Sequence, residues 1–174
     1  MQVVAHHGTS SEVAAKILDV GFIASANDYD WLGDGAYFWE NNFQRASTWA
    51  IDHHHMPVVL EATINLDDCF DLTDPKWFGI LNRNADRILE LRQARGLPPL
   101  KQENLFHGKD RYVINFVAAS MDRAGRPFRS VRGAFAEGSP AFPSSAIFSQ
   151  SHVQIAVRDP AVVSNLVTIP VERT

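Results

Sequence analysis

Residues 58–66 alternate apolar and polar side chains more cleanly than any other segment of the chain. The apolar positions are Val58, Leu60, Ala62, Ile64 and Leu66, and the positions between them include Glu61, Thr63 and Asn65. Successive side chains of a strand point to opposite faces, so this period of two predicts a half-buried β-strand. The chain is therefore expected to build a sheet with at least one covered face.

Helical spacing dominates the middle of the chain. Residues 75–95 begin with a proline, carry apolar side chains at helical spacing and are followed by Gly96 and two prolines, which favours one long helix. Further helices are expected from Ser11, as a capping residue, to the terminating Gly21, over 43–52 and over 110–123.

The two ends of the chain are rich in strand patterns. Strands are expected over 2–7, 36–39, 129–136, 153–157 and 162–171, with an extended stretch over 22–25 and polar loops over 27–35 and 138–151. Strand-rich ends around a helical middle favour an α+β fold. A length of 174 residues without internal repeats predicts one domain.

Charge is segregated along the chain although the net charge is only −4. Residues 1–82 carry three Lys and Arg against twelve Asp and Glu, whereas residues 83–132 carry eleven against five. A negatively charged partner could therefore dock on the basic middle.

Cellular setting is indicated by what the sequence lacks. One cysteine, Cys69, permits no internal disulfide, and no signal-peptide pattern opens the chain. No apolar run approaches the roughly 20 residues of a membrane-spanning helix. We expect a cytoplasmic protein without membrane contact, with Cys69 packed as a small apolar residue.

Three short motifs form a recognisable series. They are His6-His7-Gly8-Thr9, Gly33-Asp34-Gly35-Ala36-Tyr37-Phe38, and the late apolar strand beginning at His152. In this order the motifs resemble those of the His-Tyr-Glu class of ADP-ribosyltransferases, the branch that is similar to diphtheria toxin and poly(ADP-ribose) polymerase. The stretch from Ile17 to Gly21-Phe22 also resembles a family segment.

The resemblance implies a fold and a domain organisation. Residues 1–174 would form a single ADP-ribosyltransferase-like catalytic domain, an α+β fold with split antiparallel β-sheets and flanking helices. A helical, basic insert over about 75–128 matches no family motif.

The resemblance also implies NAD as co-substrate and no metal. His7 would bind the adenosine ribose with Thr9 nearby, Tyr37 would stack on the nicotinamide ring, and Trp49 would be the second stacking aromatic. Gly8 suits a contact of its backbone with the carboxamide because no side chain stands in the way. Arg45 is one of few cations near these motifs.

Gln154 stands where the family pattern has its glutamate. A neutral amide can hold a ribose hydroxyl, but it lacks the charge that stabilises an oxocarbenium-like transition state or activates an acceptor. One transfer per acceptor is therefore expected, rather than chain elongation. Glu137 or His152 could supply the missing carboxylate or base.

The chain is similar to the small toxin-type members of this class, and this resemblance implies a toxin or defence effector that modifies an RNA or DNA base, with a cognate antitoxin as partner. Its acceptor would bind the basic middle through Arg83, Arg87, Arg92 and Arg95. The open alternatives are a protein mono-ADP-ribosyltransferase, an inactive NAD- or ADP-ribose-binding module, an RNA 2′-phosphotransferase and an NAD hydrolase.

Other conspicuous side chains are expected to be structural. Trp31, Trp39 and Trp77 fit core or rim positions. The run His53 to His55 fits a solvated helix end, because adjacent residues of a helix point in different directions and no metal-ligand spacing accompanies them. The arginines of 83–95 could equally form a solvated helix face.

Overall fold

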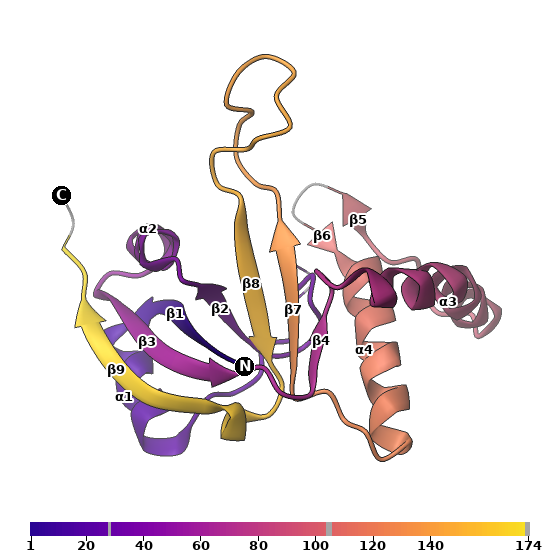
Figure 1. Ribbon diagram of the computed structural model, residues 1–174, viewed down its shortest axis with the longest axis horizontal. Helices are drawn as coiled ribbons and strands as arrows, with labels where there is room; N and C mark the ends of the chain where they lie inside the picture. Colours follow the sequence, from indigo (N-terminus) through magenta and orange to yellow (C-terminus); the bar gives the residue numbers. More distant parts are fainter. Residues whose placement is uncertain (28, 104–105, 173–174) are drawn as a thin grey trace.

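The computed structural model describes residues 1–27, 29–103 and 106–172 (Figure 1). Within them lie the helices α1 (Ser11–Val20), α2 (Phe43–His53), α3 (Pro75–Ala94) and α4 (Gly108–Arg123), and a short 3₁₀ helix, Pro160–Val162. The strands are β1 (Gln2–Ser10), β2 (Ala36–Glu40), β3 (Pro57–Asn65), β4 (Cys69–Asp71), β5 (Gln102–Glu103), β6 (Phe106–His107), β7 (Ser130–Phe135), β8 (His152–Val157) and β9 (Val163–Pro170).

The predicted α+β class is confirmed, and each predicted helix is present. α4 begins two residues earlier than expected, and β1 continues beyond His7 to Ser10. Ser10, rather than Ser11, caps α1 by accepting a hydrogen bond from the Val13 amide at 3.2 Å. β4, β5 and β6 were not predicted, because strands of two or three residues show no periodicity.

Seven strands form one mixed sheet in the order β4-β7-β8-β2-β1-β3-β9, and β5 and β6 form a separate hairpin. The expected division into two antiparallel sheets is not what the described strands form. β4 and β7 are parallel, while the other neighbouring pairs are antiparallel. The ladder between β1 and β2 is short, however. It has two residue pairs, whereas the ladder between β1 and β3 has nine.

Both faces of the sheet are covered. On one face α1 packs against Leu60, and the cluster around Phe38 and Ile155 fills the centre. On the other face α2 packs against Trp39 and Val59, and Leu32 of the loop before β2, together with α4, covers the region of β7 and β8. We call this second face the α2 face.

The insert packs against the β4 end of the sheet (Figure 1). Asp34, in the loop before β2, accepts hydrogen bonds from Arg111 at 2.8 Å and Asn115 at 2.9 Å, both on α4. Residue 28 of the same loop and residues 104–105 of the insert lie outside the described part. The insert therefore braces a loop that belongs to the motif region.

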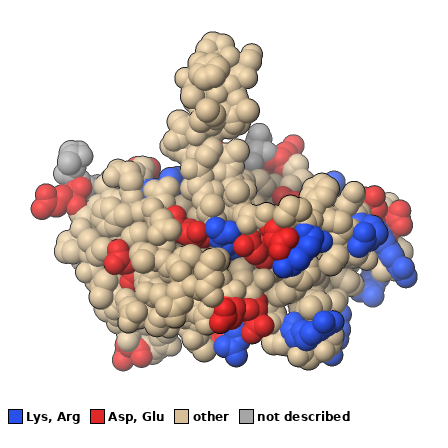
Figure 2. Space-filling model, viewed as in Figure 1, with Lys and Arg blue, Asp and Glu red and all other residues tan. Residues whose placement is uncertain are grey.

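The connection between β7 and β8 projects from the body as an arm, residues 136–151 (Figure 1). Backbone bonds order it, among them Ala141 N to Ile147 O at 2.8 Å. Phe142 and Ile147 are exposed on it, and residues 138–151 carry no charged side chain. The arm shows no blue or red beyond its base in Figure 2.

Candidate functional site

The β1–β2 ladder ends at the pair His6–Trp39, before it reaches Gly8. Val4 O accepts from Asn41 N at 2.9 Å on the β2 side, and by strand alternation the N–H and C=O of Gly8 point to that side too. These two groups therefore face the end of the ladder, outside any strand pairing of the described residues. The expected contact of these two groups with a carboxamide stays a prediction.

Gly8 also has a packing role. A Cβ at this position would come within 2.3 Å of the Ala46 carbonyl oxygen on α2. The glycine therefore allows α2 to lie directly on β1. This requirement is independent of any ligand.

His7 bridges the two strands where their ladder stops. Its Nδ1 donates to the Tyr37 carbonyl oxygen at 2.7 Å, and its ring lies between Phe22 and Phe38 at centroid distances of 5.4 and 5.5 Å. Burial lowers the pKa of His7, which favours the neutral imidazole. With the proton on Nδ1, Nε2 is left as an acceptor for a donor such as a ribose hydroxyl.

The phenol of Tyr37 is committed to the loop before β2. Its oxygen accepts from Leu32 N at 2.9 Å and donates to Gly33 O at 2.8 Å. Burial raises the pKa of Tyr37, so the hydroxyl remains protonated. The Tyr37 hydroxyl is therefore not free to act as an acid, base or nucleophile. The half-buried ring is the part of Tyr37 that could stack on a ligand.

Gln154 lies on β8 directly opposite Trp39 of β2, diagonal to Tyr37 and on the same face. Its amide oxygen accepts from the indole nitrogen of Trp31 at 2.6 Å. Trp31 is half-buried and packs against the core, in agreement with the expected core or rim position, and it also holds the side chain of Gln154.

Arg45, Glu137 and His152 form a second group on the α2 face. Arg45 Nη2 donates to Glu137 Oε2 at 2.7 Å, and its guanidinium lies 5.7 Å from the centroid of Trp39. His152 Nδ1 donates to Gln150 O at 2.6 Å and lies 3.8 Å from Glu137. Glu137 is thus paired with a cation rather than poised as a free base.

Burial lowers the pKa of His152. Its Nε2 and the indole nitrogen of Trp39 are buried without a hydrogen-bond partner in the described structure. The two rings meet edge to face at 6.3 Å. His152 keeps the potential of a base, since its unpartnered nitrogen is the unprotonated one.

Trp49 lies on α2, 6.0 Å from the ring of Trp39. The ring of His53 stacks on it at 4.4 Å, and His53 Nδ1 donates to the Trp49 carbonyl oxygen at 2.8 Å. One face of the indole is therefore already occupied. The histidine run does end a helix, as expected, and its first member is exposed to solvent while one face of its ring stacks on Trp49.

The predicted site residues outside α3 are divided between the two faces of the sheet. Most share the α2 face or the edge beside it: Gly8, Tyr37, Arg45, Trp49, Glu137, His152 and Gln154. The His7 ring lies among side chains of the opposite face and reaches the others through its bond to the Tyr37 carbonyl. Thr9 is buried beside Val58 of β3.

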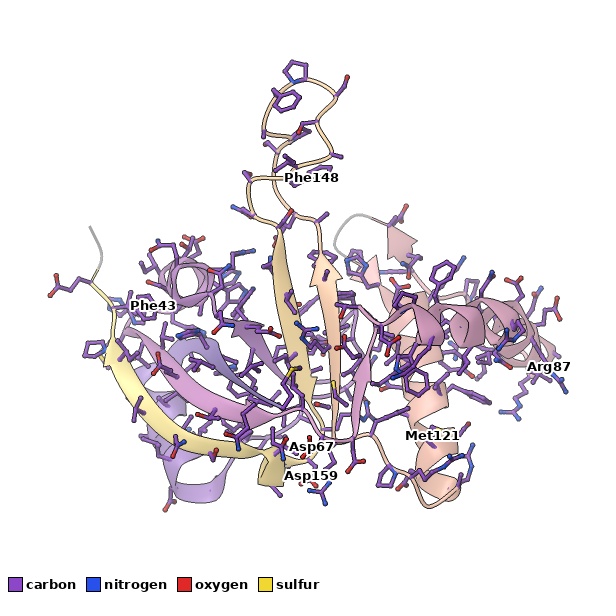
Figure 3. All side chains as sticks on the ribbon, viewed as in Figure 1. Phe43, Asp67, Arg87, Met121, Phe148 and Asp159 are labelled. Atoms are coloured by element: carbon purple, nitrogen blue, oxygen red, sulfur yellow. The ribbon has the colours of Figure 1, made fainter. Side chains whose placement is uncertain are left out.

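The four arginines lie apart from this group, on α3. Arg87 and Phe43, at the start of α2, lie at opposite sides of the molecule in Figure 3. Arg92 donates to Pro98 O at 3.0 Å and covers the ring of Tyr112 at 4.7 Å, whereas Arg83, Arg87 and Arg95 are exposed. Any contact with an acceptor there is distant from Trp49 and Arg45.

Three cations of the basic segment are paired with acidic side chains outside it. Arg132 binds Glu40 and Asp71, Arg111 binds Asp34, and Arg129 lies 3.6 Å from Asp159. These basic residues of the 83–132 segment therefore form ion pairs within the protein and are not all available to bind a partner. Burial raises the pKa of Cys69 to about 11, which keeps this thiol protonated and fits a packing role.

Sequence reasoning missed Trp31 and Asp34 as organisers of the site. Trp31 also lines a cavity of about 360 Å³, whose other walls include Leu72 and side chains of α3 and α4. The available signal was the density of aromatic and acidic residues in the loop over 27–35. Their partners lie about 80 to 120 residues away in the chain, where spacing carries no information.

Metal and membrane features can be assessed for the described residues. Among them, no group of three His, Cys, Asp or Glu side chains is arranged to hold a metal ion. Of the helices described, none combines the length and the hydropathy needed to cross a membrane.

The two buried histidines predict a pH-dependent stability. Unfolding lets His7 and His152 take up protons below about pH 6.5, whereas the folded state holds both neutral, so the unfolded state binds more protons. Stability should fall as the pH drops below about 6.5, by at most about 1.4 kcal/mol per pH unit for each histidine.

Urea unfolding of wild type and His152→Asn between pH 7.5 and pH 5 measures this dependence. Asparagine can keep the hydrogen bond to Gln150 O without titrating. The variant should show the shallower decline. Identical slopes for the two proteins would contradict the assignment of a proton-linked role to His152.

Searches against protein-family models and against curated proteins find no match for this chain.

Proposed function

We propose that the protein is an NAD-dependent mono-ADP-ribosyltransferase. The observation that carries the proposal is the junction of β1 and β2: His7 bonds the Tyr37 carbonyl at the point where the ladder stops, beside the unpaired backbone of Gly8. This hydrogen bond brings the His-Gly-Thr and Gly-Asp-Gly-Ala-Tyr motifs side by side, although His7 and Tyr37 are 30 residues apart in the chain, and their contact supports a shared site.

The residues present fit NAD in their donor and acceptor chemistry. Gly8 offers a backbone donor and acceptor that suit a carboxamide, and neutral His7 offers an acceptor that suits a ribose hydroxyl. Tyr37 and Trp49 supply aromatic rings near the same joint. Arg45, whose guanidinium lies 5.7 Å from the centroid of Trp39, is available for a phosphate only if it leaves Glu137.

The reaction breaks the bond between nicotinamide and ribose and forms a bond from the same ribose carbon to the acceptor. Nicotinamide leaves with the bonding electrons, and the acceptor gives up its proton. The neutral Gln154 cannot take that proton, which supports a single transfer over chain growth. His152, which has an unpartnered nitrogen, is the better candidate for the base, but that nitrogen is buried and would have to become accessible to the acceptor.

A nucleic acid is the acceptor that we favour, in the setting of a toxin or defence effector neutralised by a cognate inhibitor. The exposed arginines on α3 and the excess of Lys and Arg over residues 83–132 support a polyanionic partner, although the net charge of the chain is −4. A protein acceptor is the second candidate, supported by the uncharged arm with its exposed Phe142 and Ile147.

Adenine-labelled NAD distinguishes these acceptors. The protein is incubated with labelled NAD and RNA, DNA or lysate protein, and the fraction that retains label is identified. We expect label in RNA or DNA. Label in protein alone would contradict the nucleic-acid acceptor, and free ADP-ribose alone would indicate hydrolysis.

Charge reversal tests the docking surface in the same assay. Changing Arg83, Arg87, Arg92 and Arg95 to Glu should lower labelling of a polyanionic acceptor by about tenfold or more, because each lost phosphate contact weakens binding. Nicotinamide release without acceptor is the internal control and should be unchanged. Undiminished labelling would remove α3 from the binding surface.

An inactive binding module is the remaining alternative. Gln154 in place of a glutamate favours it, whereas the joined His7 and Tyr37 speak against it. Nicotinamide release by the wild type that falls to a low residual rate in Gln154→Ala and Tyr37→Ala would exclude this alternative.

A further inference from the structure

We propose that Trp31 is a positioning residue for Gln154, and that it turns the amide so that Gln154 presents hydrogen-bond donors to the substrate. The inference rests on the proposed function. It concerns whether residue 154 offers hydrogen-bond donors or acceptors to the substrate. A glutamate at this position would offer acceptors only.

The bond between the two side chains fixes which amide atom faces which way. Trp31 Nε1 and Gln154 Oε1 are 2.6 Å apart. An indole N–H can only donate, so its partner must be the amide oxygen rather than the amino group. The amino group of Gln154, with two N–H donors, is consequently the end that remains for a ligand.

The sheet is shaped to seat the indole beside Gln154. Gly133 lies directly opposite Gln154 in the β7–β8 ladder, and a Cβ on it would approach the Trp31 ring to 2.8 Å. The ring of Phe135, two residues further along β7, packs on Trp31 at 4.9 Å. Gly133 therefore leaves room for the indole of Trp31, and the ring of Phe135 packs against it.

The loop that carries Trp31 is itself anchored at both sides. Leu32 N donates to the Tyr37 hydroxyl, and Asp34 N donates to Asn115 on α4 at 3.0 Å. Trp31 holds Gln154, and its neighbour Leu32 binds the Tyr37 hydroxyl. The same loop therefore supports both Tyr37 and Gln154.

The donor polarity has a chemical consequence. A ribose hydroxyl bound by the Gln154 amino group is held through its oxygen lone pair, and its own proton is not drawn away. The site thus selects for an oxygen acceptor on the substrate and contributes orientation rather than base catalysis.

Trp31→Phe tests the inference, because it keeps an aromatic ring and removes the N–H. It should lower kcat for nicotinamide release by about 10- to 100-fold, which is typical of lost positioning contacts, and leave KM for NAD within about twofold. In a Gln154→Ala background the same change should have almost no effect. An equal loss in both backgrounds, or no loss in either, would overturn the inference.

Two further variants guard against a folding defect. Gly133→Ala should push the indole away and reproduce the kcat loss of Trp31→Phe, with urea midpoints recorded for each protein. Trp77→Phe is the matched control. Trp77 lies on α3, and its buried indole N–H has no hydrogen-bond partner in the described structure. Its kcat should equal that of the wild type, and an equal loss there would contradict a specific role for Trp31.

Nuclear magnetic resonance separates this inference from the proposed function. The ¹H–¹⁵N indole signal of Trp31, assigned with Trp31→Phe, should shift in Gln154→Ala and exchange faster with solvent. An unchanged signal would overturn the positioning inference alone. A shifted signal in a protein that releases no nicotinamide would overturn the proposed function, and with it the substrate role of Gln154.

Discussion

Replacing Arg132 by Met is expected to destabilise the protein by about 3–5 kcal/mol, the cost of leaving a buried carboxylate without its partner. Arg132 on β7 binds both oxygens of Glu40 on β2, at 2.6 and 2.9 Å, and reaches Asp71 at 3.0 Å. The Arg132 and Glu40 side chains are only 15% and 12% exposed. Equilibrium urea unfolding measures the loss.

Two variants test that explanation. Arg129→Met removes a cation whose partner, Asp159, lies 3.6 Å away, both being nearly half exposed, so it should cost no more than about 1 kcal/mol. Adding Glu40→Leu to Arg132→Met should recover most of the lost stability, because no buried charge then remains at Glu40. Equal losses for Arg129→Met and Arg132→Met would contradict the buried-pair account.

His7→Ala is expected to lower kcat/KM for nicotinamide release by about 100- to 1000-fold, as removal of a single well-placed polar contact does in other enzymes. The change removes the acceptor Nε2 and also the bond that joins β1 to the Tyr37 carbonyl. Steady-state release of nicotinamide from NAD measures the effect.

His7→Asn separates these two contributions. An asparagine amide can still donate to Tyr37 O but has no group at the position of Nε2. It should keep the urea midpoint near that of the wild type while losing most of the activity. Retained activity would show that His7 serves only to join the strands.

His6→Asn is the matched control for both His7 variants. The side chain of His6 lies on the other face of β1 and pairs with Glu61 at 3.1 Å. Release should stay within about threefold of wild type. A loss as large as that of His7→Ala would contradict the assignment of His7 as the contact residue.

Elements with periodic side chains could be predicted from the sequence, and elements without periodicity could not. The alternation over 58–66 corresponds to β3, and the proline start and glycine stop of the long helix correspond to α3 within one residue. β4 is missed because its three residues gain strand form only by pairing with β7. The single mixed sheet likewise depends on partners distant in sequence.

The candidate site shows the same limit. Motif order singled out His7, Tyr37 and Gln154, and whether they form an NAD site stays a prediction. What spacing could not reveal is how they are held: His7 by a backbone carbonyl of β2, Gln154 by Trp31, and the intervening loop by α4. Each of these contacts is a product of tertiary packing.

Nicotinamide release is the most direct test of the claim that the β1–β2 junction binds and cleaves NAD. Purified wild type is incubated with NAD and a mixture of RNA, DNA and lysate protein, and free nicotinamide is quantified by chromatography. We predict release well above the buffer rate, with loss in His7→Ala and Tyr37→Ala. Intact NAD in the presence of folded wild type and every acceptor would contradict the account.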